Sequence, residues 1–170
     1  EIGNLEELTV CNLSENYFNS ELPTEIGHCS KLEQLRLNKN ELNGNIPASI
    51  GKLSNLQYLY LNNNKFTGEV PSDLSSLKNL MELHLNNNEL VGDAGGDAGI
   101  LNIFKNCDRL LNIYLHENDQ VNDEMIDLEK EIPGLQVLRW LHLPKQGLQP
   151  RGDLGLDAKN VMKIWTLLNG

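Results

Sequence analysis

The sequence contains few aromatic residues and no long apolar run. Aromatic residues make up 5% of its 170 residues, although 39% are hydrophobic, so a core must be built mostly from aliphatic side chains. No stretch approaches the roughly 20 apolar residues that a membrane-spanning helix needs, and we therefore expect no membrane insertion. A chain of this length fits one globular unit better than two.

Cysteines are also scarce. The three present, Cys11, Cys29 and Cys107, are far apart in the chain, and no Cys-x-x-Cys pair occurs. Such a set indicates neither a disulfide framework nor a zinc ribbon. We therefore expect three buried free thiols.

Basic residues are outnumbered by acidic ones. The chain has 14 Lys and Arg against 24 Asp and Glu, which gives a formal net charge of -10. This charge repels phosphate backbones and anionic lipids. We therefore predict a protein or peptide partner that is neutral to basic, and no nucleic-acid partner.

Sequence motifs of catalysis are missing. No GxSxG, no GxxxxGK[ST] and no GxGxxG after a predicted strand occurs, and these motifs accompany nucleophilic or nucleotide-dependent chemistry. His28 and Cys29 are the one adjacent His–Cys pair, and Cys29 falls at an expected core position. We predict that the protein is not an enzyme and needs no cofactor.

The sequence is rich, by contrast, in one repeat. An asparagine recurs at intervals of 24 residues and then once after 30, at Asn16, Asn40, Asn64, Asn88 and Asn118. Apolar residues stand three, five and eight positions before each, which completes the pattern LxxLxLxxN five times. The alternation predicts short strands with apolar residues facing inward, and stacked strands would form a parallel sheet. Each asparagine would satisfy backbone groups of neighbouring turns.

The segments that follow the asparagines add a second motif. Residues 42–47 read LNGNIP and residues 66–71 read FTGEVP, while the first repeat has Ser20 in place of the glycine. The repeats resemble the plant-specific class of leucine-rich repeat, LxxLxLxxNxLxGxIPxxIGxLxx. The resemblance implies an α/β fold, namely a right-handed leucine-rich-repeat solenoid with a parallel sheet on its concave face and 3-10 or irregular turns on its convex side. We expect proline to end strand pairing after each asparagine.

The whole chain, 1–170, is predicted to be a single domain of about six rungs. Five clear repeats span 1–120, a degenerate repeat spans 121–150 with a strand near Leu138 to Leu143, and a capping helix spans 155–170. Gly-Asp-Ala-Gly occurs twice in succession at 92–99, which predicts a mobile loop. Residues 1–3 are in phase with residues 25–27, so we expect the natural protein to be longer at its N-terminus.

Two columns of outward side chains are predicted on the sheet. The central column is Asn12, Arg36, Tyr60, His84, Tyr114 and His142, and its neighbour is Val10, Gln34, Tyr58, Glu82, Asn112 and Trp140. Tyr, Trp and Arg are the residue types that dominate binding interfaces. We predict that a partner binds the concave face through Arg36, Tyr58, Tyr60, Glu82, His84, Tyr114, His116, Trp140 and His142.

Other interpretations of these columns remain open. Tyrosines on a sheet also stabilise their cross-strand neighbours. His84, His116 and His142 lie on successive rungs, but the sequence shows neither an HExxH spacing nor a second shell of acids, so we predict no metal site.

The sequence therefore predicts a recognition module that binds a protein or peptide. One alternative is a structural subunit of a larger assembly, which an apolar patch on the convex turns would support. Another, implied by the resemblance, is a secreted inhibitor or a fragment like a receptor ectodomain. The resemblance implies an extracellular or cell-surface location, whereas the unpaired cysteines and the lack of a signal peptide in this chain are compatible with the cytoplasm.

Overall fold

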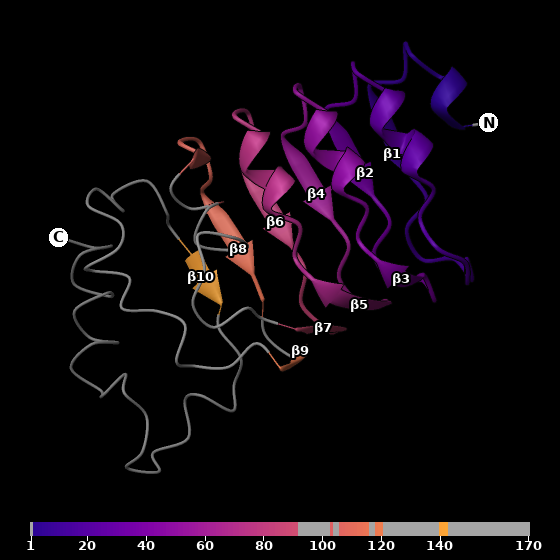
Figure 1. Cartoon of the computed structure of the whole chain (residues 1–170), viewed down its shortest axis with the longest axis vertical. Coiled ribbons are helices and arrows are strands. Elements are labelled where there is room, and N and C mark those ends of the chain that lie inside the picture. Colours follow the sequence, from indigo (N-terminus) through magenta and orange to yellow (C-terminus); the bar gives the residue numbers. More distant parts are fainter. Residues whose placement is uncertain (1, 92–102, 104–105, 116–117, 121–139, 143–170) are drawn as a thin grey trace, which may run out of the picture.

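A computed structural model describes residues 2–91, 103, 106–115, 118–120 and 140–142. Within these residues the chain winds into rungs that stack side by side in chain order, from the N-terminal end toward β10 (Figure 1). The second and third rungs each contribute a strand to one sheet, a strand to a second sheet and a short 3-10 helix. This arrangement is the leucine-rich-repeat fold expected from the sequence.

The main sheet has six parallel strands in chain order. They are β1 (Val10–Asn12), β2 (Gln34–Arg36), β4 (Tyr58–Tyr60), β6 (Glu82–His84), β8 (Asn112–Tyr114) and β10 (Trp140–His142). The register is unbroken, because Cys11 pairs with Leu35, Leu35 with Leu59, and so on to Leu141. The predicted strands are thus confirmed, including the one in the degenerate repeat.

A second parallel sheet follows the asparagines. Its strands are β3 (Asn43–Asn45), β5 (Lys65–Glu69), β7 (Asn88–Val91) and β9 (Asn118–Gln120). The sequence did not predict this second sheet, but the expectation that proline ends the strand pairing is confirmed. The prolines come just after β3 and β5, where they remove no ladder donor, and Gly44 and Gly68 reach the bend with φ of 70° and 72°.

Short 3-10 helices form the remaining side, as predicted. They are η1 (Ile2–Asn4), η2 (Thr24–His28), η3 (Ala48–Lys52) and η4 (Ser72–Ser76). A proline with φ between -65° and -70° stands directly before each of the last three. Its fixed φ suits the start of a helical turn, where its missing N–H costs nothing.

The core consists of aliphatic columns that run along the stack. Side chains at equivalent positions of successive rungs, such as Leu35, Leu59 and Leu83, are fully buried against one another. Cys11, Cys29 and Cys107 are buried free thiols, as expected. Burial raises the pKa of each thiol, that of Cys107 to about 11.

The asparagine ladder joins each rung to the one before it. The Asn64 amide donates to the carbonyls of Leu61 and Leu37, both at 3.0 Å, and its oxygen accepts the Leu42 N–H at 3.1 Å. Asn40, Asn88 and Asn118 make the same kinds of contact. The predicted role of the asparagines is therefore confirmed.

The residues directly before the ladder asparagines form a second column along the stack. Glu15, Lys39, Asn63 and Asn87 all adopt left-handed backbone, with φ between 55° and 58°. Asparagine tolerates this conformation better than most residues. The Asn87 amide also donates to the Asn63 side-chain oxygen at 2.7 Å, so these asparagines serve the turn.

Several predicted features fall outside the described residues. They are the duplicated segment 92–99, the capping helix at 155–170, and all of 121–150 except β10. Within the part of the chain that the structure describes, no helix is long and apolar enough to cross a membrane.

Candidate binding surface

The outward face of the main sheet displays the side chains that lie between the core positions. In β2, β4, β6 and β8 the middle residue is buried and the two flanking residues are half-buried. The flanking residues therefore point away from the core on every strand. Because the register is unbroken, equivalent flanking residues form straight columns across the sheet.

A row of rings crosses three strands in the central column. The Tyr60 and His84 rings lie 4.4 Å apart at 78°, and the His84 and Tyr114 rings lie 4.2 Å apart at 40°. The Tyr58 ring lies 6.5 Å from that of Tyr60. These separations fit favourable edge-on and tilted ring contacts, so the row is one packed surface.

Arg36 extends the row to β2. Its guanidinium carbon lies 4.9 Å from the centre of the Tyr60 ring, which is a cation–π distance. One terminal nitrogen donates to the Gln34 side chain at 3.3 Å. No carboxylate of the described residues lies within 4.0 Å of the guanidinium, so its charge is not neutralised by an ion pair there.

Glu82 lies in the neighbouring column and contacts Tyr60 and His84 in the middle of the row. It accepts a hydrogen bond from the Tyr60 hydroxyl at 2.5 Å and one from the Asn112 amide at 3.2 Å. The same carboxylate lies 3.5 Å from Nε2 of His84. Burial and the Glu82 carboxylate raise the pKa of Tyr60, so the phenol stays protonated and keeps donating at neutral pH.

The structure brings together six of the nine predicted site residues, namely Arg36, Tyr58, Tyr60, Glu82, His84 and Tyr114. His116 lies outside the described residues. For Trp140 and His142 the strand is described, in register with Asn112 and Tyr114. The sequence prediction left out Gln34 and Asn112, although both stand in the outward columns. It selected aromatic, histidine and charged side chains and passed over amides.

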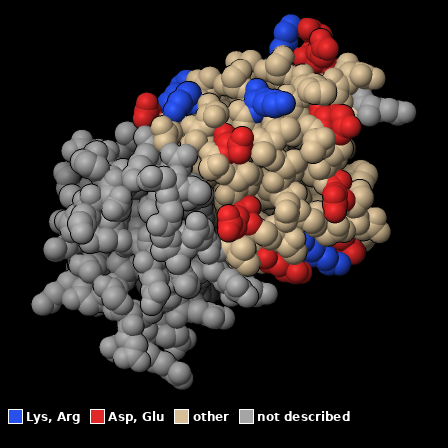
Figure 2. Space-filling view, in the orientation of Figure 1, with Lys and Arg blue, Asp and Glu red and all other residues tan. Residues whose placement is uncertain are grey.

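This surface presents aromatic rings, hydrogen-bonding groups and the Arg36 charge. Among the described residues no group of three His, Cys, Asp or Glu side chains is placed to hold a metal ion. Figure 2 shows charged side chains scattered around a largely uncharged surface on the side in view. The ring contacts are also compatible with the alternative that these tyrosines stabilise their neighbours.

Comparison with known proteins gives a consistent result. The family model "Leucine Rich Repeat" matches residues 7–29, 31–53 and 55–77. The plant peptide hormone receptor RGFR1 in complex with RGF2 superposes with a TM-score of 0.70 at 29% identity, over 84% of this chain and 21% of the receptor chain. No curated protein sequence matches the chain significantly.

Two ectodomains from Arabidopsis thaliana are also similar. That of the receptor kinase SOBIR1 has a TM-score of 0.62 at 33% identity, over 70% of this chain and 61% of that one. That of the receptor kinase GASSHO1/SCHENGEN3, in complex with Casparian strip integrity factor 2, has a TM-score of 0.68 at 31% identity, over 90% of this chain and 18% of that one. This chain therefore spans less than two thirds of each of these relatives.

Proposed function

The chain is a leucine-rich-repeat protein of the plant-specific class, and from that premise we propose that it binds a peptide or protein ligand on the outward face of its main sheet. The repeat class places this face on the concave side of the solenoid. The binding residues in this proposal are Arg36, Tyr58, Tyr60, Glu82, His84 and Tyr114, together with His116, Trp140 and His142.

The observation that carries the proposal is the continuous row of Arg36, Tyr60, His84 and Tyr114. Their side chains pack on one another across four strands. Arg and Tyr are enriched among residues that dominate binding energy. Since neighbouring rings and Glu82 already hold these side chains in place, a ligand would lose little free energy in ordering them.

The size of the row favours an extended peptide segment. Neighbouring strands lie about 4.8 Å apart, so the distance from β2 to β8 is roughly 14 Å. An extended peptide advances about 3.3 Å per residue, and four to five residues would cross the row. Two of the similar ectodomains are in complexes, one with RGF2 and the other with Casparian strip integrity factor 2, which supports a ligand-binding role.

The structural-subunit alternative finds less support. An exposed apolar patch along the convex turns would support it. The exposed large hydrophobic side chains of the described residues, Leu5, Val10, Leu13, Tyr17 and Phe18, all belong to the first rung. Along η2, η3 and η4 the described surface therefore offers no such patch.

The proposal is tested by ligand capture with paired variants. The double variant Tyr60→Ala with Tyr114→Ala removes two central rings, and each such truncation typically costs about 2 kcal/mol of binding, roughly a 30-fold loss in affinity. The control is Lys65→Ala with Thr67→Ala on β5 of the second sheet. We expect immobilised wild type and control to capture the same ligand, identified by mass spectrometry, and the double variant to lose it. Full capture by the double variant would show that ligands bind elsewhere.

A further inference from the structure

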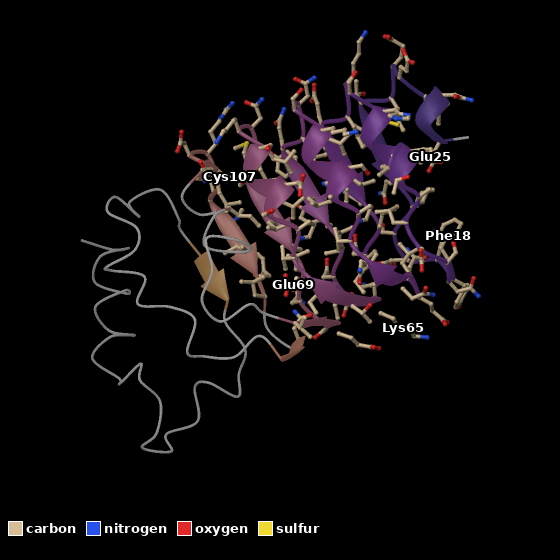
Figure 3. All side chains as sticks on the ribbon, viewed as in Figure 1. Phe18, Glu25, Lys65, Glu69 and Cys107 are labelled. Carbon is tan, nitrogen blue, oxygen red and sulfur yellow. The ribbon has the colours of Figure 1, made fainter. Side chains whose placement is uncertain are left out.

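Two rungs carry three asparagines in succession shortly after a strand of the main sheet. The triplets are residues 62–64 in the third rung and 86–88 in the fourth, and the second rung has asparagine at positions 38 and 40. Figure 3 shows Lys65, the first residue of β5, at the side of the stack where the second sheet lies. The triplet 62–64 therefore lies where the chain passes from the main sheet to the second sheet.

The second and third members of each triplet have structural roles. Asn64 and Asn88 belong to the ladder, and each donates to a carbonyl of the preceding rung. Asn63 and Asn87 adopt left-handed backbone, and their side chains are joined by a hydrogen bond of 2.7 Å. Ladder and turn thus account for two of the three asparagines in each triplet.

The first members, Asn62 and Asn86, have no such role. Their main-chain carbonyls accept from the ladder asparagines of their own rungs at 3.5 and 3.4 Å, but their side chains make no hydrogen bond to any described residue. Asn62 is half-buried and Asn86 is only 8% exposed. A buried amide without a hydrogen-bond partner destabilises the fold, so packing of the described residues does not explain the Asn86 side chain.

The first asparagine of each triplet faces the same side as the row of rings. The backbone ladder of the main sheet continues past the strand ends, because the Leu61 N–H donates to the His84 carbonyl at 2.9 Å and the Asn63 N–H donates to the Asn86 carbonyl at 3.0 Å. Leu85, between His84 and Asn86, is fully buried in the core. Alternation along the chain then points the Asn86 side chain outward, beside that of His84.

Asn38, Asn62 and Asn86 form one column along the stack, here called the amide column. It runs beside the row of rings, with rungs about 4.8 Å apart. A carboxamide donates and accepts hydrogen bonds at once, so it complements the N–H and C=O groups of a peptide main chain. It carries no charge, and it therefore does not select for a charged side chain of a ligand.

We propose that the amide column binds main-chain N–H and C=O groups of an extended peptide whose side chains contact the row of rings. This inference rests on the proposed function and adds which part of the peptide each column recognises. Main-chain hydrogen bonds give affinity whatever the sequence, and side-chain contacts give specificity. The peptide main chain supplies the partners for the Asn86 amide, and a residue that lacks a main-chain N–H is excluded at that place.

The test uses synthetic peptides as probes. Capped random peptides of about seven residues, longer than the four to five that cross the row, are passed over immobilised wild type. The best-retained sequence is then made again with a methyl group on one main-chain nitrogen at a time. We expect isothermal titration calorimetry to show at least tenfold weaker binding for methylation at one or two positions. Equal binding of all the methylated peptides would overturn the proposal.

Protein variants assign the methylation effect to the amide column. Asn62→Ala with Asn86→Ala should weaken binding of the parent peptide at least tenfold and should remove the difference between parent and methylated peptides, as coupled partners do in a double-mutant cycle. The control, Asn45→Ala, changes an exposed asparagine of β3 on the second sheet and should alter neither value. A tenfold difference that persists in the double variant would show that other groups bind the main chain.

Two measurements separate binding from folding. The double asparagine variant should keep the melting temperature of wild type, unlike Asn64→Ala, because its missing side chains bond to no described residue. In isotope-labelled wild type, the side-chain amide signals of Asn62 and Asn86 in NMR spectra should shift when the parent peptide is added. This second result does not depend on the variant, and unmoved signals of both side chains would overturn the proposal.

Failure of this proposal is distinguishable from failure of the proposed function. If wild type retains no peptide, or if Tyr60→Ala with Tyr114→Ala binds the parent peptide as wild type does, the proposed function fails and this inference with it. If the tyrosine variant loses the peptide while Asn62→Ala with Asn86→Ala binds it at full affinity, the proposed function stands and the amide column has no part in binding.

Discussion

The first and third rungs follow the same sequence pattern but differ in their surroundings. Leu13 and Phe18 are exposed in the first rung, whereas their equivalents Leu61 and Phe66 are fully buried in the third. The Asn16 side chain donates only within its own rung, but the Asn64 side chain joins two rungs. The difference teaches that a rung has little core of its own, and that its stability comes from the neighbours on either side.

The largest expected effect comes from the aliphatic columns. Leu61→Ala should destabilise the protein by about 2–5 kcal/mol, because it leaves a cavity between two packed rungs. Leu13→Ala should cost less than half as much, since that side chain already contacts water. Denaturant unfolding of both variants measures the difference, and equal losses would break the comparison between the rungs.

The asparagine ladder should show the same contrast at a smaller scale. Asn64→Ala removes bonds to Leu37, Leu61 and Leu42, and unsatisfied buried groups cost about 1–3 kcal/mol. Asn16→Ala should cost roughly 0.5 kcal/mol, as for an exposed substitution. Thermal unfolding of the two variants tests this, and wild-type stability of Asn64→Ala would refute the structural role of the ladder.

The stacking register was predictable because it repeats. A period of 24 residues fixes which side chains share a column in β1, β2, β4 and β6, and the pattern LxxLxLxxN extends the columns to β8 after a gap of 30. The inward and outward residues of these five strands therefore followed from the sequence alone. The second sheet was not predicted, because 3-10 or irregular turns were expected for the segments around Gly44 and Gly68. These segments instead pair with the equivalent segments of the neighbouring rungs. The sequence pattern within one rung does not predict that pairing.

The candidate site was predictable as a set of columns but not as a network. Position alone identified Tyr60, His84 and Tyr114 as outward residues. The hydrogen bonds that Glu82 accepts from Tyr60 and Asn112 depend on the rotamers of side chains on neighbouring strands, which no sequence spacing specifies.

A third prediction concerns the alkaline side of the pH scale. Burial and Glu82 raise the pKa of Tyr60 in the folded state, whereas the unfolded value is about 10. A raised folded pKa contributes stability that is complete below the unfolded pKa and is lost as pH rises beyond it. Tyr60→Phe should therefore show a smaller loss of unfolding free energy above about pH 10 than wild type. The first rung has Asn12 at the position equivalent to Tyr60, so this pH dependence is expected for the third rung and not for the first.

The buried thiols provide the control for this pH comparison. The pKa of Cys107 is raised to about 11 by burial, so wild type and variant share its contribution. Urea unfolding at several pH values from 8 to 11 gives the difference between the two proteins. Parallel curves throughout this range would show that Tyr60 is not held in its neutral form by the fold.

The smallest expected effect concerns the left-handed column. The third and fourth rungs have Asn63 and Asn87 there, whereas the first two have Glu15 and Lys39, which form an exposed ion pair at 2.7 Å. An exposed pair contributes about 0–1 kcal/mol, and asparagine is less strained in this backbone. We expect Glu15→Asn with Lys39→Asn to raise stability by about 0.5 kcal/mol, measured by denaturant unfolding. A loss above about 1 kcal/mol would mean that the ion pair outweighs the backbone term.

Photo-crosslinking shows whether a ligand contacts the outward face of the main sheet. A benzophenone amino acid would replace Tyr58 on β4 or, in a separate protein, Thr67 on β5 of the second sheet. Both residues are half-buried in the third rung, so the two probes differ mainly in the sheet that carries them. We expect the captured ligand to crosslink to position 58 and not to position 67. Crosslinking at position 67 with none at position 58 would contradict this expectation.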